Sequence, residues 1–235
     1  MSAELNCAVL LAAGSGARME GTVEDKILAP LNGRPVFSYS LKAFAESGSI
    51  HSLCIVYRDE GQKEQLSASI GDASGKEVIW VQGGAERQDS VLTGLEALPE
   101  NTTHTLIHDC ARPLITKDLI GQLIDTTRDD GAACLAHPAT DTIKRIPAAG
   151  LLQKTELEDL DRSRLWAMET PQAFRHADIL QAYQYVTADG FQITDDCAAA
   201  ATLGIKTTLI HNPSPNPKIT TAHDLDYVSW LLTKT

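Results

Sequence analysis

Three features that would point to common partners are missing from this sequence. Lysine and arginine number 20 against 31 aspartate and glutamate residues, so the net charge is -11 and no basic excess is present to bind nucleic acid or an anionic membrane. No apolar run approaches the roughly 20 residues needed to cross a bilayer. The first residues carry Glu4 rather than the basic start of a signal peptide. We therefore expect no nucleic-acid and no membrane partner, whereas one locally basic cleft could still bind a small anionic ligand.

Patterns typical of disulfides and of metal sites are also missing. The five cysteines are odd in number and widely spaced, and no two form a C-x-x-C pair. Cys7, Cys54 and Cys134 fall in apolar runs that are typical of strands, which predicts buried free thiols. Free thiols are typical of a reducing compartment, so we expect a cytoplasmic protein. His108 beside Asp109 has no further ligands at metal-site spacing, so we expect a structural histidine.

The sequence does contain a regular alternation of short apolar runs and amphipathic segments. With 235 residues, 43% of them hydrophobic, the chain is expected to form a single domain over residues 1–235. Near-continuous apolar strands separated by helices predict an α/β fold with a mainly parallel, doubly wound (Rossmann-like) sheet. Strands are predicted at 7–12, 53–57, 78–81, 105–108, 132–136 and 207–210. Helices are predicted at 35–47 and 87–98, around 119–124 and 179–186, and at 194–204 and 225–232.

One stretch, at about 138–165, breaks this alternation. Residues 140–146 and 151–157 look extended, and the Pro-Ala-Ala-Gly sequence between them is typical of a turn. We therefore predict a β-hairpin arm that protrudes from the sheet. Because an isolated hairpin is marginally stable in water, we expect the arm to pack against another surface, with a second subunit as the candidate.

A glycine-rich segment follows the first predicted strand and reads LLAAGSGARM at residues 10–19. Small residues let backbone N–H groups approach phosphate oxygens, and a cation can then neutralise them. The segment has no G-K-[ST], which excludes a P-loop, and Met19 replaces the third glycine of the dinucleotide fingerprint. The residues alone leave open a phosphate cradle or a plain strand-to-loop turn. Its place after the first strand favours the cradle, because doubly wound sheets bind phosphates there.

The segment LAAGSGARM followed by Lys26 resembles the signature of sugar-phosphate and alditol-phosphate nucleotidyltransferases. Further segments are similar to the 2-C-methyl-D-erythritol 4-phosphate cytidylyltransferases of the non-mevalonate isoprenoid pathway, over about residues 8–230. These segments are GGAERQDSVLTGL at 83–95, IHDCARPLI at 107–115, DTIKR at 141–145, DRSRLWAMETPQAF at 161–174, ITDD at 193–196 and NPKIT at 216–220. The resemblance implies that CTP and the alditol phosphate give a cytidine-diphospho alditol and pyrophosphate, by direct attack of the substrate phosphate on the α-phosphorus of CTP. A phosphate monoester is already anionic, so no general base is needed.

The resemblance also implies a role for each matching residue. The catalytic cations are Arg18, Lys26, Arg162 and Lys218. The nucleotide contacts are Ala12, Ala13, Gly14, Gly84, Ala85 and Ser90. The contacts to the alditol phosphate are Asp109, Arg112, Thr142, Thr170 and Thr194. The chain departs from the family pattern at Asp25, where proline is common before the lysine, and at Ala85, where aspartate is common.

Several of these residues have a plain structural alternative. Lys26 could be a solvated lysine among acidic neighbours, Asp109 and Arg112 could form a local ion pair, and Thr194 could cap a helix. The resemblance implies a homodimer in which the arm brings Thr142 and Arg162 into the partner's site. We expect Mg²⁺ with CTP on charge grounds and name no protein ligand for it. The alternatives for function are a transferase acting on ribitol 5-phosphate, a molybdenum-cofactor cytidylyltransferase, and a non-catalytic nucleotide-binding relative.

Overall fold

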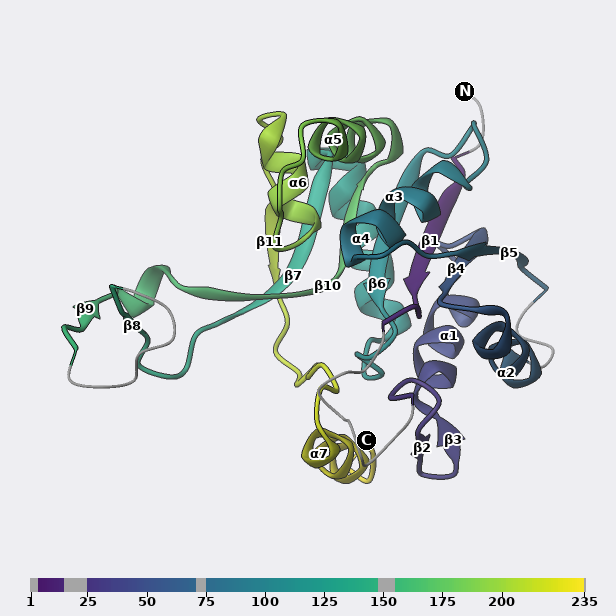
Figure 1. Ribbon diagram of the computed structural model, residues 1–235, viewed down its shortest axis with the longest axis horizontal. Coiled ribbons are helices and arrows are strands. Elements are labelled where there is room, and N and C mark those ends of the chain that lie inside the picture. The colour runs from purple at the N-terminus through teal and green to yellow at the C-terminus, as the bar shows by residue number, and fades with distance from the viewer. Residues whose placement is uncertain (1–3, 15–24, 71–74, 148–154, 235) are drawn as a thin grey trace.

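The computed structural model describes residues 4–14, 25–70, 75–147 and 155–234. A seven-stranded sheet runs through it in the order β11-β7-β10-β6-β1-β4-β5 (Figure 1). Within this sheet β10 runs antiparallel to both its neighbours, and the other pairings are parallel. The strands are β1 (Asn6–Leu11), β4 (Ser52–Tyr57), β5 (Glu77–Gln82), β6 (His104–Asp109), β7 (Ala132–Pro138), β10 (Trp166–Arg175) and β11 (Thr208–His211). The prediction of a mainly parallel α/β sheet is confirmed.

Helices cover both faces of the sheet, because alternate strand residues point to opposite sides. One core joins Leu10 and Leu53 of the sheet to Phe44 and Leu123, from α1 and α4. The other core joins Val9 to the helices on the opposite face. The helices are α1 (Val36–Glu46), α2 (Glu60–Ile70), α3 (Arg87–Glu96), α4 (Lys117–Asp130), α5 (His176–Ala188), α6 (Asp196–Thr202) and α7 (Ala222–Leu232). No helix among the described residues is long and apolar enough to cross a membrane.

The strand β10 and the helix α2 were not predicted from the sequence. The strand β10 contains Pro171, and a proline argues against a central strand because it cannot donate to the ladder. The structure accommodates it where the pairing of β10 with β7 shifts register, between Met168 and Gln172. The helix α2 is mostly polar and buries only Gln62 and Leu66, so it shows no apolar stripe.

The arm leaves the sheet between β7 and β10 and extends far from the body, at the left of Figure 1. Its pairing is short: β8 (Lys144–Arg145) pairs antiparallel with β9 (Glu158–Asp159). The predicted hairpin is therefore present, but its second strand pairs after residues 151–157, not within them. Residues 148–154, which include most of the predicted turn, lie outside the described part of the chain.

The C-terminal helix α7 holds a loop near the carboxyl ends of the parallel strands. Val228 of α7 packs with Ile219 and with Leu31 of the small ribbon formed by β2 (Pro30–Leu31) and β3 (Arg34–Pro35). The amide of Ile219 donates to the carbonyl of Ala111, just after β6, at 2.8 Å. The residue before Ile219, Lys218, is thereby fixed beside the end of β6.

Candidate active site

A cavity of about 450 Å³ opens at the carboxyl end of β1, beside the ends of β5 and β6. The strand order reverses here, since β4 follows β1 on one side and β6 lies on the other. Doubly wound sheets bind ligands at such a switch point. The wall nearest β1 is made by Ala12, Ala13 and Gly14, whose small side chains leave the backbone accessible.

The turn between β5 and α3 forms a second wall and has no room for larger side chains. A Cβ on Gly83 would lie 2.6 Å from Ser90 Oγ and 2.9 Å from Ala13 Cβ, and one on Gly84 would lie 2.3 Å from Asp89 Cβ. The Gly84 amide donates to Ser90 Oγ at 3.1 Å. Glycine is therefore required here by close packing.

Two cations lie at the β1 side of the cavity. Lys26 lies against Gly14, whose added Cβ would be 4.0 Å from Lys26 Nζ. Arg58, at the end of β4, also lines the cavity, and its Nη1 lies 3.1 Å from Asp25 Oδ2. Asp25 is buried; its carboxylate accepts from Gln62 Nε2 at 2.7 Å and from the amide of Ile27 at 3.1 Å. The residue that departs from the family pattern therefore anchors the segment that carries Lys26.

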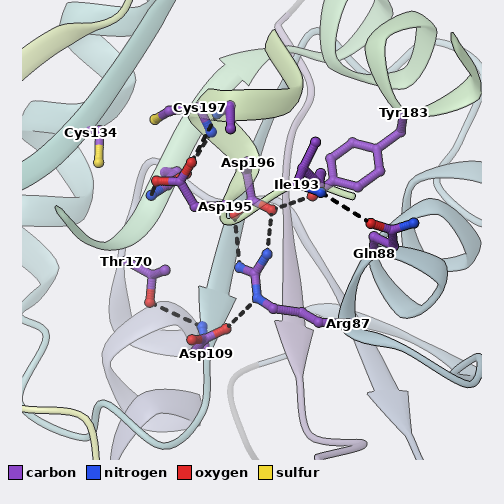
Figure 2. A network of polar contacts seen from close by, with 12 residues as sticks. Arg87, Gln88, Asp109, Cys134, Thr170, Tyr183, Ile193, Asp195, Asp196 and Cys197 are labelled. Carbon is purple, nitrogen blue, oxygen red and sulfur yellow. Dashed lines mark hydrogen bonds and ion pairs between the residues drawn. The ribbon is translucent and has the colours of Figure 1, made fainter. Parts of the chain in front are cut away.

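A buried charge network forms the opposite wall (Figure 2). Asp109 lies at the end of β6 and pairs with Lys218 through Oδ2 and with Arg87 Nε through Oδ1, the latter at 3.3 Å. The Nη1 and Nη2 atoms of Arg87 donate to the two carboxylate oxygens of Asp196, at 2.8 and 2.9 Å. The hydroxyl of Tyr183 donates to Asp196 Oδ1 at 2.5 Å. Arg87 therefore bridges the end of β6 and the start of α6.

These contacts shift the protonation equilibria in a consistent direction. Burial acts to raise the pKa of Asp109, but the charges of Arg87 and Lys218 outweigh it and hold that pKa well below its usual range. Burial acts to lower the pKa of Arg87, but Asp196 and then Asp109 raise it. Burial and the neighbouring Asp196 raise the pKa of Tyr183 well above its usual value. The Asp109 carboxylate is therefore ionised and Tyr183 is neutral at physiological pH.

Lys218 is placed by a second set of buried contacts. The carboxylate of Glu169 accepts from Asn212 Nδ2 and Asn216 Nδ2, both at 2.9 Å, and Asn216 lies two residues before Lys218. Arg112 Nη1 donates to the carbonyl oxygen of Asn216 at 2.7 Å. Arg112 thus supports the loop of Lys218 and does not form the local ion pair with Asp109 that its spacing allowed.

His108 and Thr170 are buried beneath Asp109. The Asp109 amide donates to Thr170 Oγ1 at 3.1 Å, and His108 contacts Thr170 Oγ1 and Ser40 Oγ, each at 3.2 Å. Burial lowers the pKa of His108 to about 3, so the ring is neutral. His108 is thus a structural histidine, as expected, and Thr170 supports the backbone of Asp109.

The structure brings most of the predicted site residues together at one cavity. The cavity is lined by nine of them: Ala12, Ala13, Gly14, Lys26, Gly84, Ala85, Ser90, Asp109 and Lys218. Arg18 lies outside the described residues. Thr142 and Arg162 are exposed on the arm, where Arg162 Nη1 donates to the carbonyl of Thr140 at 3.0 Å.

Thr194 is exposed before α6 and does not cap it. Asp195 is the cap instead, because its carboxylate accepts from the amide of Ala198 at 2.8 Å. The sequence analysis also missed Arg87 and Arg58 as cavity residues. Arg87 was visible inside the segment GGAERQDSVLTGL, and Arg58 directly follows the strand beside β1.

The fold and the site define an α/β enzyme of the nucleotidyltransferase class, with fixed cations around a cavity at the switch point of its sheet. The sequence model of the 2-C-methyl-D-erythritol 4-phosphate cytidylyltransferase family matches residues 6–234. The chain belongs to this family.

Individual relatives agree with the family match. The chain is 39% identical to the 2-C-methyl-D-erythritol 4-phosphate cytidylyltransferase of Synechococcus sp. (strain CC9902), over 92% of this chain and 93% of that one. It is 35% identical to the enzyme of that name from Shouchella clausii (strain KSM-K16), over 97% and 96%. The crystal structure of 4-diphosphocytidyl-2C-methyl-D-erythritol synthase from Anaerococcus prevotii superposes with a TM-score of 0.84 at 25% identity, covering 98% of this chain and 99% of that one.

Proposed function

We propose that the chain converts CTP and 2-C-methyl-D-erythritol 4-phosphate into 4-diphosphocytidyl-2-C-methyl-D-erythritol and pyrophosphate by direct displacement. The observation that supports this most is the placing of Lys26 and Lys218 in one cavity with the small-residue turns at Gly14 and Gly84. The turns suit a nucleotide, and the cations suit phosphates at either end of it.

In this reaction the protein has to position the two substrates and to stabilise negative charge. The substrate phosphate is anionic and attacks the α-phosphorus; the bond between that phosphorus and the bridging oxygen to the β-phosphate breaks, and the electron pair leaves with pyrophosphate. In this proposal Lys26 offers positive charge to the triphosphate, and Lys218 holds the attacking phosphate. Because negative charge builds up on the α-phosphate and the leaving group, fixed ammonium groups stabilise the transition state more than the ground state.

The two small-residue turns, at Gly14 and Gly84, would select the nucleotide. Backbone amides and carbonyls at Ala13 and Gly84, with the hydroxyl of Ser90, can read the edge of a pyrimidine. We expect CTP to be preferred over the purine nucleotides, because these groups would match the edge of cytosine.

Magnesium is proposed as a companion of the triphosphate. No cluster of three histidine, cysteine, aspartate or glutamate residues able to hold a metal occurs among the described residues. The carboxylate of Asp109 is already engaged by Arg87 and Lys218. The donor set therefore suits a Mg²⁺ ion that arrives bound to phosphate oxygens and keeps water ligands, and its chemistry there would be to neutralise phosphate charge.

We also propose that the arm completes the site of a second copy of the chain. The arm exposes the apolar side chains of Ile143 and Leu157, and Trp166 at its base, which are 43%, 60% and 39% accessible. Thr142 and Arg162 are on the same arm, away from the cavity of their own chain. A homodimer in which each arm packs on its partner would bury this apolar surface and bring the two polar side chains to the partner's cavity.

The cytoplasmic location remains part of the proposal. It is supported by the cysteines, all five of which are free and four of which are buried. Burial raises the pKa of the Cys54 thiol to about 12, so this group is unreactive at physiological pH.

The activity is tested by measuring pyrophosphate release from each of the four nucleoside triphosphates, with methylerythritol phosphate or ribitol 5-phosphate supplied. We expect release from CTP with methylerythritol phosphate only. Faster turnover of ribitol 5-phosphate would establish the alternative substrate, and no release in any combination would leave a non-catalytic nucleotide-binding protein.

The shared site is tested by mixing two inactive chains, Lys26→Ala and Arg162→Ala. Random exchange puts half the chains in heterodimers, each with one intact site, so about a quarter of the wild-type activity should return. Heterodimer formation is checked with two affinity tags. Heterodimers that form without any recovery of activity would show that each site is built within one chain.

A further inference from the structure

The position of the Lys218 ammonium group in this structure differs from the position that the proposed function requires. To hold a substrate phosphate, its ammonium group must turn toward that phosphate, yet in this structure it is paired with Asp109. The Asp109 side chain is only 11% accessible to solvent. A buried carboxylate that loses its only partner is costly, so without another cation Lys218 would be held back on Asp109.

Arg87 is the second cation on Asp109, and the structure prevents it from moving away. Its two terminal nitrogens are held by both oxygens of Asp196, at 2.8 and 2.9 Å, and only its Nε reaches Asp109. Asp196 is fully buried and is fixed in turn by the hydroxyl of Tyr183. Figure 2 shows Arg87 pointing between the two carboxylates, one on β6 and one on α6. A bidentate contact of this kind fixes the plane of the guanidinium group.

We propose that Arg87 is a positioning residue that keeps Asp109 electrically compensated while Lys218 turns to the substrate phosphate. This inference rests on the proposed function, in which Lys218 holds the alditol phosphate. Two carboxylates and two cations balance before the substrate binds. After Lys218 turns, Arg87 still faces Asp109, so that carboxylate stays ionised, in place, and available to the substrate hydroxyls.

The proposal makes opposite predictions for the two ends of the Arg87–Asp196 pair. Among the described residues, removing the cation in Arg87→Gln leaves Lys218 as the one cation on Asp109, so the KM for the alditol phosphate should rise at least tenfold with little change in the KM for CTP. Asp196→Asn removes the second carboxylate charge that Arg87 faces, so that the positive charge of Arg87 acts on Asp109 alone. That variant should keep or lower the KM for the alditol phosphate.

A purely structural role predicts a different pattern, in which both substitutions break the same ion pair and impair both substrates alike. That pattern in the kinetic measurements would overturn the proposal. Tyr183→Phe removes only the hydroxyl that fixes Asp196 and leaves every charge in place, so we expect a smaller rise in the same KM. The matched control is Arg128→Gln, a surface arginine that also pairs with two carboxylates, those of Glu4 and Asp125. It should leave both KM values unchanged.

Two further measurements distinguish a folding defect, and a failure of the proposed function, from a failure of the proposal for Arg87. If Arg87→Gln alone fails to fold, as a thermal melt would show, the double variant Arg87→Gln/Asp196→Asn removes both charges and leaves no lone buried ion. Its KM for the alditol phosphate should still rise at least tenfold, and a wild-type value would overturn the proposal. A wild-type chain without transferase activity would instead refute the proposed function.

Discussion

The cavity and the arm hold similar ion pairs in opposite surroundings. At the cavity, Arg87 meets Asp196, a carboxylate with no solvent exposure. On the arm, Arg145 meets Glu158 at 3.0 Å, and their side chains are 65% and 55% accessible. The first pair is surrounded by packed protein and by two further charges, whereas the second can exchange its partner for water at little cost.

This difference shows that the length of an ion pair does not by itself tell how strongly the pair constrains the structure around it. The buried pair constrains which way a guanidinium points, and so it can tune a site. The exposed pair contributes little to the stability of the arm.

Loss of the Lys26 ammonium should be the most damaging change to the cavity. In Lys26→Ala we expect kcat/KM to fall about 10²- to 10³-fold, because a preorganised positive charge at the leaving pyrophosphate is removed. Steady-state kinetics with CTP and methylerythritol phosphate measure this. Lys42→Ala, which removes an exposed lysine paired with Glu46 on α1, is the control and should keep wild-type kinetics. A loss of less than tenfold in Lys26→Ala would remove Lys26 from the reaction.

Acid should act on the sheet beside the cavity rather than on the arm. The pKa of His108 is lowered from 6.5 to about 3 by burial, so below about pH 6.5 the unfolded chain binds a proton that the folded chain does not. The free energy of unfolding therefore falls as the pH falls from about 6.5 to about 3. Asp109, whose pKa is also lowered, stays ionised through this window and adds no loss until the pH falls below its unfolded pKa of about 3.9.

The test compares the wild type with His108→Gln by denaturant titration at pH 6.5 and at pH 4.5. The wild type should lose about 2 kcal/mol more stability than the variant between these values. The arm, residues 139–165, contains no histidine, so it cannot supply this difference. Equal losses in the two proteins would show that His108 does not set the acid sensitivity.

The smallest effect is expected from the ion pair on the arm. A double-mutant cycle with Arg145→Gln and Glu158→Gln should give a coupling below about 0.5 kcal/mol in the free energy of unfolding, because both groups are solvated. The same cycle with Arg87→Gln and Asp196→Asn should give a coupling of about 2 kcal/mol or more, because Arg87→Gln alone leaves the fully buried carboxylate of Asp196 without its cation. Equal couplings would mean that burial does not separate the two regions.

Most strands and helices of the body could be predicted from local sequence patterns, and the elements that could not have clear physical causes. Apolar runs such as the one around Val9 predict buried parallel strands, and those strands form. β10 was not predicted because it contains Pro171. The proline is tolerated there because the pairing of β10 with β7 shifts register, which the local sequence does not show. The mostly polar α2 gave no periodic signal, since it buries only Gln62 and Leu66.

The candidate site divides in the same way. The order of the motifs identified Lys26, Ser90, Asp109 and Lys218, and the structure places all four around one cavity. The partnership of Arg87 with Asp109 and Asp196 spans 22 and 109 residues of sequence, so no local spacing could reveal it. Thr194 was a reasonable helix cap by residue type, but the neighbouring Asp195 reaches the amide of Ala198.

The sequence by itself determined the strand and helix pattern and the small-residue turns, because these depend on side-chain chemistry and short-range spacing, and its resemblance to a known family pointed to the cations. Only the tertiary structure decided which carboxylate each cation faces and that Asp25 anchors the segment of Lys26. It also decided that the arm stands clear of the body (Figure 1). Those outcomes depend on which distant segments meet at the end of the sheet, and burial there turns ordinary charges into a fixed network.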